Sequence, residues 1–170
     1  PLAGDLEHKD SMGNVAVIRN GDIQVMSAGT GIQHSEYNRS KDQEVKFLQI
    51  WVFPNKRNVT PRYDQLPLKL DDRHNRLQQV LSPNPDDEGV WIHQDAWFHI
   101  GQFDQGKGTA YSLKRKGNGV YVFVLSGSIE VDGQALESRD GFGIWDVESF
   151  NLKATSESAE VLLMDVPMSV

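Results

Sequence analysis

Apolar residues recur at every second position along most of this chain, and that spacing predicts β-strands rather than helices. VYVFVL (120–125) and EVLLMDV (160–166) are apolar at nearly every position, which is typical of strands covered on both faces. KFLQIWVF (46–53) has the same character and is also predicted to be a strand buried between layers. SIEV and QALE flank Asp132-Gly133, a strong two-residue hairpin signal. Residues 70–81 alone have a helical spacing, and a short irregular segment there is the alternative.

Turn signals separate these segments every eight to twelve residues or so, which favours an all-β sandwich or barrel. An internal repeat supports this fold class, because LAGDLEH (2–8) and LSGSIEV (125–131) share the pattern Leu-x-Gly-x-apolar-Glu. Several predicted strands precede the second copy, whereas only Pro1 precedes the first. We therefore expect the first β-unit to lack its opening strands.

Composition limits the kind of chemistry. The chain has 170 residues, a net charge of −7 and no cysteine. Disulfides, thiolate metal sites and cysteine nucleophiles are thereby excluded, and a metal ion would need nitrogen and oxygen ligands. The acidic balance argues against direct binding of nucleic acid, and the basic run 114–116 is predicted to be a solvated turn or strand end. No apolar run approaches the length of a membrane span, so a cytoplasmic protein is the default expectation.

The candidate chemistry lies in MSAGTGIQHSEYN (26–38). His34 and Glu36 are two residues apart on a predicted strand, so both side chains point to one face and toward one metal ion. Gly29 and Gly31 form a turn before them, which permits either a close approach of the backbone or an ordinary turn with positive φ. One strand does not supply a complete coordination sphere, and an isolated His-x-Glu is also common on solvated strands.

Four stretches together resemble the pirin family of bicupins, particularly its bacterial members. The resemblance extends over essentially the whole chain and is strongest over residues 4–65. It is carried by GDLEHKDSMGN (4–14), GDIQVMSAGTGIQHSEYN (21–38), LQIWVFP (48–54) and TPRYDQ (60–65).

The resemblance implies two jelly-roll-like cupin β-barrels, with residues 1–72 forming an incomplete N-terminal cupin domain and residues 73–170 a C-terminal cupin domain without metal ligands. The family's metal has four protein ligands, of which His34 and Glu36 match the second pair. The first pair, a His-x-His motif, would lie upstream of residue 1, so occupancy of the site in this chain stays open. Iron is the first expectation for the metal, with manganese, nickel, copper and zinc as alternatives.

The implied activity is that of a flavonol (quercetin) 2,3-dioxygenase, with a flavonol-like aromatic compound and O₂ as substrates. Glu36 would be a metal ligand, the base that takes the proton of the flavonol 3-hydroxyl group, or both at different stages. The alternative is a metal-containing regulatory module that contacts protein partners, as in transcription complexes, without turnover. For the incomplete barrel, we expect either a separate segment or self-association with a second copy to cover its open edge.

The remaining histidines and tryptophans receive structural roles. His8 is predicted on the outer face of its strand, and His74 in a solvated loop. His93 and His99 are predicted in the core or an interface, with Gln94-Asp95 interrupting the strand between them. The tryptophans are predicted to be core residues; they are Trp51, Trp91, Trp97 and Trp145.

Overall fold

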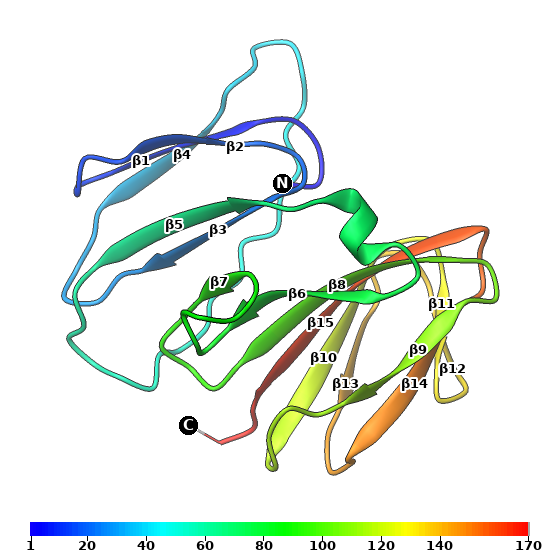
Figure 1. Ribbon diagram of the computed structural model, residues 1–170. Coiled ribbons are helices and arrows are strands. Elements are labelled where there is room, and N and C mark those ends of the chain that lie inside the picture. Colours follow the sequence, from blue (N-terminus) through cyan, green and yellow to red (C-terminus); the bar gives the residue numbers. More distant parts are fainter. Residues whose placement is uncertain (170) are drawn as a thin grey trace.

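The protein is almost entirely β-structure, as the computed structural model of residues 1–169 shows (Figure 1). One short 3-10 helix, η1 (Leu70–Arg73), interrupts the strands in the described part of the chain. The strands are β1 (Leu6–Asp10), β2 (Val15–Ile18), β3 (Asp22–Ser27), β4 (His34–Asn38), β5 (Arg62–Pro67), β6 (Leu77–Ser82), β7 (Val90–Trp91), β8 (Trp97–Asp104), β9 (Gly108–Ser112), β10 (Asn118–Ser126), β11 (Ile129–Val131), β12 (Gln134–Leu136), β13 (Gly141–Ile144), β14 (Ser149–Ala154) and β15 (Ser158–Pro167). The all-β prediction is confirmed.

The strands form four sheets in two groups. The first five strands make a three-stranded sheet, β2-β1-β4, and a two-stranded sheet, β3-β5. The later strands make a six-stranded sheet, β13-β10-β15-β8-β6-β7, and a four-stranded sheet, β12-β11-β14-β9. The two groups lie side by side in Figure 1, with β6 and β7 next to the early strands. The boundary between two cupin domains at residue 72 stays a prediction.

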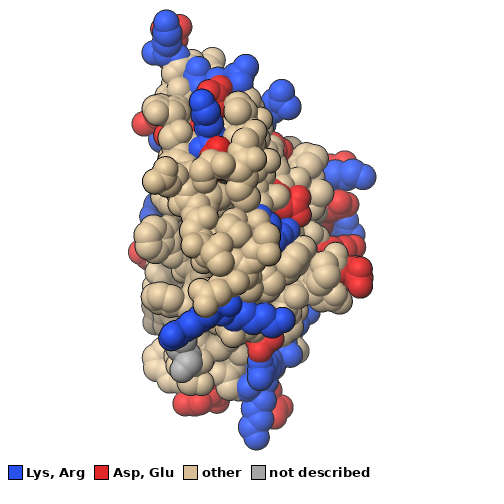
Figure 2. Space-filling model, turned by 90° about the vertical axis from the view of Figure 1, so that its left-hand side faces the viewer, with Lys and Arg blue, Asp and Glu red and all other residues tan. Residues whose placement is uncertain are grey.

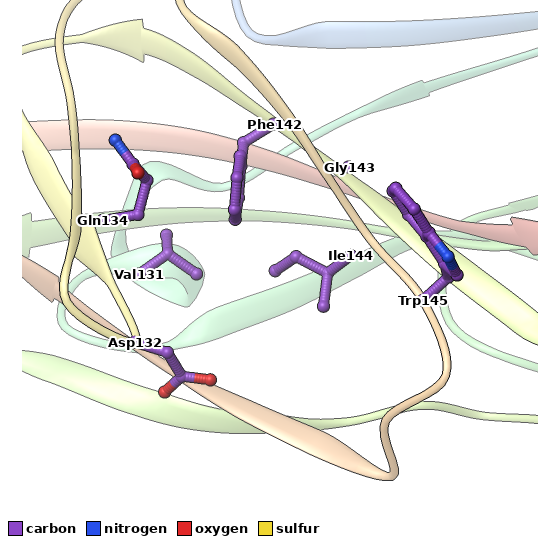
Figure 3. A pocket seen from close by; sticks show the side chains of 7 residues that line it. All are labelled: Val131, Asp132, Gln134, Phe142, Gly143, Ile144 and Trp145. Carbon is purple, nitrogen blue, oxygen red and sulfur yellow. The ribbon is translucent and has the colours of Figure 1, made fainter.

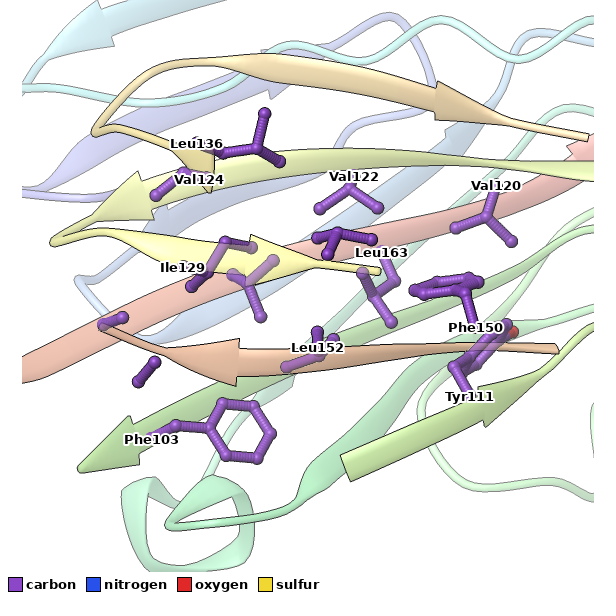
Figure 4. Packing of buried hydrophobic residues seen from close by; sticks show 14 residues of the cluster. Phe103, Tyr111, Val120, Val122, Val124, Ile129, Leu136, Phe150, Leu152 and Leu163 are labelled. Atoms are coloured by element: carbon purple, nitrogen blue, oxygen red, sulfur yellow. The ribbon is translucent and has the colours of Figure 1, made fainter. Parts of the chain in front are cut away.

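An apolar core fills the space between the six-stranded and the four-stranded sheet (Figure 4). Alternate residues of β10 and β14 point into it, as the period-two pattern requires. The aromatic members of this cluster are Phe103, Tyr111 and Phe150, and each is almost fully buried. This half of the chain therefore has the dry core of an ordinary β-sandwich.

A second apolar cluster joins the two groups of sheets. Val25 of β3 packs with Val80, Leu81 and Phe98 from β6 and β8. Arg62 of β5 adds a polar link, because its guanidinium lies 3.9 Å from the centre of the Trp91 ring and donates a 2.6 Å hydrogen bond to the Trp91 carbonyl oxygen. The early strands are thus fixed to the later ones by packing and by a cation–π contact.

The internal repeat has a structural counterpart. Gly4 and Gly127 occupy the same place in the two repeats, and both have positive φ, +67° and +74°. A Cβ atom at Gly4 would overlap the backbone oxygen of Glu44, and a Cβ at Gly127 would overlap that of Ser158. The segment after Glu44 therefore corresponds to β15, which begins at Ser158.

This correspondence explains why the strand predicted at 46–53 is wrong. β15 has hydrogen-bonded neighbours on both sides, β10 and β8. Residues 46–53 have no such neighbours among the described residues, and they form a single bridge, between Lys46 and Ala3. The apolar pattern is that of a buried strand, but most of the side chains are exposed, Trp51 by 87%; Val52 alone packs against the second apolar cluster. A strand needs partners for its backbone as well as an apolar pattern.

Most of the other predicted elements are confirmed. Asp132 and Gly133 both have positive φ, as a type I′ hairpin turn requires, and they join β11 to β12. Within 70–81, η1 covers one turn, an irregular stretch follows at 74–76 and β6 begins at Leu77, so the full helix is wrong and the irregular alternative holds only for the first part. The prediction of core tryptophans is wrong for Trp51 and for Trp145, which is 57% exposed, while Trp91 and Trp97 are only partly buried.

The surface is not strongly polarised in the view of Figure 2, where basic side chains lie toward the two ends and uncharged side chains cover a wide band between them. Residues 114–116 are exposed, as predicted, and Arg115 forms an ion pair with Asp95. No helix within residues 1–169 has the length and apolar character needed to cross a membrane.

Candidate functional site

β4 carries the two predicted site residues. His34 and Glu36 both belong to this strand, so their side chains share a face, as expected. The turn before β4 is held at Gly29, where φ is +54° and a Cβ atom would overlap the carbonyl oxygen of Val59. Thr30 donates its backbone N–H to that same oxygen at 3.0 Å. Gly29 thus has the positive φ of an ordinary turn, and its close backbone contact is with Val59.

β1 places His8 beside this pair, which contradicts the prediction that His8 faces outward. In the antiparallel β1–β4 register His8 lies opposite Glu36, and Asp10 lies opposite His34. The His8 side chain is only 1% exposed, and its Nδ1 is 3.6 Å from Oε1 of Glu36. The physical reason is simple: Leu6 and His8 are two residues apart, so the strand that buries Leu6 buries His8 as well.

Asp10 anchors the far side of the His8 ring. Its Oδ2 lies 3.2 Å from Nε2 of His8 and accepts a 2.8 Å hydrogen bond from the Asn14 side chain, while Oδ1 accepts the backbone N–H groups of Met12 and Asn14. Burial raises the pKa of Asp10, but the hydrogen bonds from Asn14, His8 and Met12 outweigh it and lower the pKa to about 2. The ionised carboxylate can only accept, so Nε2 of His8 carries the shared proton.

β3 and β5 supply the opposite wall of the site. Gln24 donates a 2.6 Å hydrogen bond from Nε2 to Oε1 of Glu36. The Tyr63 ring stacks on His8 with 4.5 Å between ring centres, and its hydroxyl group donates to Gln65 at 3.0 Å. Burial, followed by the charge of Glu36, raises the pKa of Tyr63 to about 12, so the phenol stays neutral at physiological pH.

The interior between these small sheets is therefore polar, in contrast to the later half of the chain. Two of its buried atoms, Nδ1 of His8 and Oε1 of Gln24, have no hydrogen-bond partner in the structure. Unpaired buried polar atoms are costly, and they typically mark a place that accommodates water, an ion or a ligand. Sequence reasoning missed His8, Asp10, Gln24 and Tyr63 as site residues; for the first two, the alternation of LEHKD carried the signal.

The chemistry of His34 and Glu36 fits part of a transition-metal site, because an imidazole nitrogen and a carboxylate oxygen suit iron, manganese, nickel and copper. Across residues 1–169, no group of three or more His, Asp or Glu side chains is arranged to hold one metal ion. The pair would therefore contribute two donors, and other ligands would complete the coordination sphere.

Two pockets of the molecule lie away from this polar interior. One, of about 280 Å³, opens between the β11–β12 hairpin and β13 and is lined by Val131, Asp132, Gln134, Phe142, Gly143, Ile144 and Trp145 (Figure 3). Another, of about 410 Å³, lies between the end of β5, η1 and β6. The first contains no histidine and a single carboxylate, so its chemistry does not match that of a metal centre; we base the functional site on the side chains of the polar interior.

The interior of the later sheets has one polar end, next to the apolar core. The Asp165 carboxylate accepts hydrogen bonds from the Tyr111 hydroxyl, the Asn118 side chain and the Lys114 backbone. His99 is buried nearby against the Tyr111 ring, and burial, together with the charge of Lys114, lowers its pKa to about 4. A bend at residues 93–95 separates His99 from His93, as predicted. The Asp165 carboxylate therefore has its hydrogen-bond donors, and His99 beside it is a neutral histidine of the core.

Two family models match the chain: the one described as Pirin over residues 2–52, and the quercetinase C-terminal cupin domain over residues 79–166. Among curated proteins, a quercetin 2,3-dioxygenase from Escherichia coli (strain K12) is 37% identical over 166 residues, which cover 98% of this chain and 70% of the relative. A pirin-like protein from Caulobacter vibrioides is 34% identical over 163 residues, covering 95% of this chain.

Solved structures give the same result. The crystal structure of the bacterial pirin YhhW from Escherichia coli in complex with nickel(II) has a TM-score of 0.89 and 34% sequence identity. The similarity covers 97% of this chain and 69% of that protein. A second crystal structure of YhhW has a TM-score of 0.90 at 35% identity.

Proposed function

Because the chain belongs to the pirin family of two-cupin proteins, we propose that it is a metal-dependent dioxygenase that acts on flavonol-like aromatic compounds. The observation that carries the proposal is that His34 and Glu36 share one face of β4, with Glu36 beside a polar interior in which buried atoms lack partners. The relative named as a quercetin 2,3-dioxygenase and the nickel complex of YhhW support the same activity and a transition metal.

His34 and Glu36 would hold the metal ion. When bound, the ion would act as a Lewis acid that lowers the pKa of the substrate's 3-hydroxyl group. The carboxylate of Glu36 would be a ligand of the ion, the base that takes the proton of that hydroxyl group, or both at different stages. His34 is exposed whereas His8 is buried, so substrate would approach from the side of His34.

Tyr63 and His8 would form the rigid side of the site. Tyr63 stacks on His8, and His8 lies next to the Glu36 carboxylate. The hydrogen bond from His8 to Asp10 keeps the imidazole from rotating. A base that is held in one orientation needs no reorganisation when it receives a proton.

A second candidate function is the metal-containing interaction module without turnover. Tyr121 and Trp145 favour it, because both are large aromatic side chains exposed on or beside the edge strand β13. Aromatic residues of this kind are enriched at protein interfaces.

Turnover of quercetin separates the two functions. The metal-loaded protein is incubated with quercetin, and the loss of the flavonol absorbance is followed together with O₂ uptake. The dioxygenase proposal predicts equal consumption of both, and greatly reduced rates in Glu36→Gln. A metal-loaded protein that leaves quercetin intact would refute the enzyme and favour the interaction module.

A further inference from the structure

The two oxygens of the Glu36 carboxylate have different surroundings. Oε1 accepts the 2.6 Å hydrogen bond from Nε2 of Gln24 and lies 3.6 Å from Nδ1 of His8. Within residues 1–169, no hydrogen bond or ion pair involves Oε2, and the side chain keeps 14% of its surface exposed. One oxygen is therefore held by the protein, and the other is available to a ligand.

We propose that Gln24 is a positioning residue, which fixes Oε1 of Glu36 against His8 so that Oε2 is the oxygen presented to the metal. Glu36 then binds the ion through one oxygen, since Oε1 is already occupied by a donor. Hydrogen bonds of this kind orient the ligands of metal sites and set their affinity. The inference rests on the proposed function, and it adds a residue to which that function assigns no role.

The position of Gln24 explains why its amide is available for this task. Gln24 lies on β3, opposite Gln65 of β5 in the register of that pair. The Gln65 amide already has acceptors close to its own strand: Nε2 donates to the Val17 carbonyl oxygen and to the Asp22 carboxylate. Gln24 instead reaches across the interior to β4, and its own Oε1 stays without a partner. The two glutamines are therefore chemically matched, but only Gln24 touches Glu36.

A double-mutant cycle on nickel(II) affinity tests the proposal. Gln24→Met keeps the length of the side chain but removes the donor, and it should weaken nickel binding roughly tenfold. In a Glu36→Leu background, which has no acceptor for the Gln24 amide, the same substitution should change affinity by less than about twofold. Gln79→Met is the control, because the Gln79 amide donates to the Glu88 carbonyl oxygen away from the site, and it should also stay within about twofold of wild type. Full additivity of the Gln24 and Glu36 effects would overturn the inference.

A measurement without metal distinguishes failure of this inference from failure of the proposed function. In ¹H–¹⁵N spectra of the metal-free protein, the Gln24 side-chain amide, identified by its loss in Gln24→Met, should have a proton shifted downfield by the carboxylate and should return toward the other glutamines in Glu36→Leu. If Glu36→Leu leaves nickel affinity unchanged, the metal site itself is wrong and the inference falls with it. If Glu36→Leu weakens binding but Gln24→Met does not, only the role of Gln24 is wrong.

Discussion

His8 and Glu36 face each other across the β1–β4 pair, although 28 positions separate them in the chain, and Nδ1 of the imidazole lies 3.6 Å from the Glu36 carboxylate. A slip of one residue in this register would replace His8 by Glu7 or Lys9, because alternate side chains point to opposite faces. The site therefore depends on what fixes the register of β1. Asp10, at the end of β1, ties the turn to β2 through Met12 and Asn14.

Asp10→Ala should disturb both the turn and the site. The backbone N–H groups of Met12 and Asn14 lose their acceptor, and His8 loses the hydrogen bond that fixes its ring. We expect a lower midpoint of thermal unfolding and weaker nickel binding in the same variant. Asp42→Ala, in an exposed loop, is the control for removing a carboxylate. Unchanged metal affinity in Asp10→Ala would show that His8 needs no anchor.

His34→Ala should abolish or greatly weaken metal retention, because it removes the nitrogen donor of the pair on β4. The thermal midpoint of the metal-free protein should change little, since His34 is exposed. Elemental analysis after dialysis measures the effect, with His74→Ala, another exposed histidine, as the control. Equal metal content in His34→Ala and wild type would remove His34 from the site.

His99 should make the protein less stable in mild acid. Its pKa is lowered from 6.5 to about 4 in the folded state, first by burial and then by Lys114. Between these values the unfolded chain binds the proton and the folded chain does not. The contribution of His99 to the free energy of unfolding is therefore fully present above about pH 6.5 and is lost as the pH falls toward 4. The loss amounts to about 3 kcal/mol, at 1.36 kcal/mol per pKa unit.

His99→Phe should remove most of this pH dependence, because phenylalanine keeps a ring against Tyr111 but does not titrate. Urea unfolding of the variant and of wild type at several pH values between 4 and 7.5 gives the comparison. The same slope in both proteins would mean that other groups cause the acid sensitivity.

Gly29→Ala should destabilise the turn that leads into β4 by about 1–3 kcal/mol, since the Cβ atom meets the Val59 carbonyl oxygen and φ is positive. Gly106→Ala isolates the effect of positive φ, because Gly106 has φ of +76° and open space where its Cβ would lie. Equal losses of unfolding free energy in the two variants would show that the contact with Val59 is unimportant.

The strands whose hydrogen-bonded neighbours lie in the later sheets could be predicted from the sequence. β10, β15 and the β11–β12 hairpin have strong local patterns, and each finds neighbours within the later sheets. The pattern at 46–53 is equally strong, yet it forms no strand, because hydrogen-bonded neighbours are not encoded in the segment itself. Trp51 shows that an apolar residue in a strand-like pattern is buried only when a second layer covers it.

Only the part of the candidate site that lies on a single strand could be predicted from the sequence. The spacing of His34 and Glu36 placed both on one face, and the resemblance to pirins gave that face a role. Gln24 and Tyr63 lie on other strands, and their contacts with Glu36 and His8 depend on how two sheets pack, which no local spacing encodes. His8 differs, because the alternation that buries Leu6 already implied its inward direction.

The contrast between the polar early interior and the apolar later core also determines how the molecule opens. Among residues 1–72 the fully buried apolar side chains are Leu6, Ile18 and Val25, whereas the later sheets enclose the large cluster around Phe103 and Phe150. Local opening of β1 and β4 therefore costs less free energy than global unfolding, and their amides should exchange with solvent sooner than those of β10 and β15. The later sheets are therefore the more stable part of the fold, and the early strands are the part that opens first.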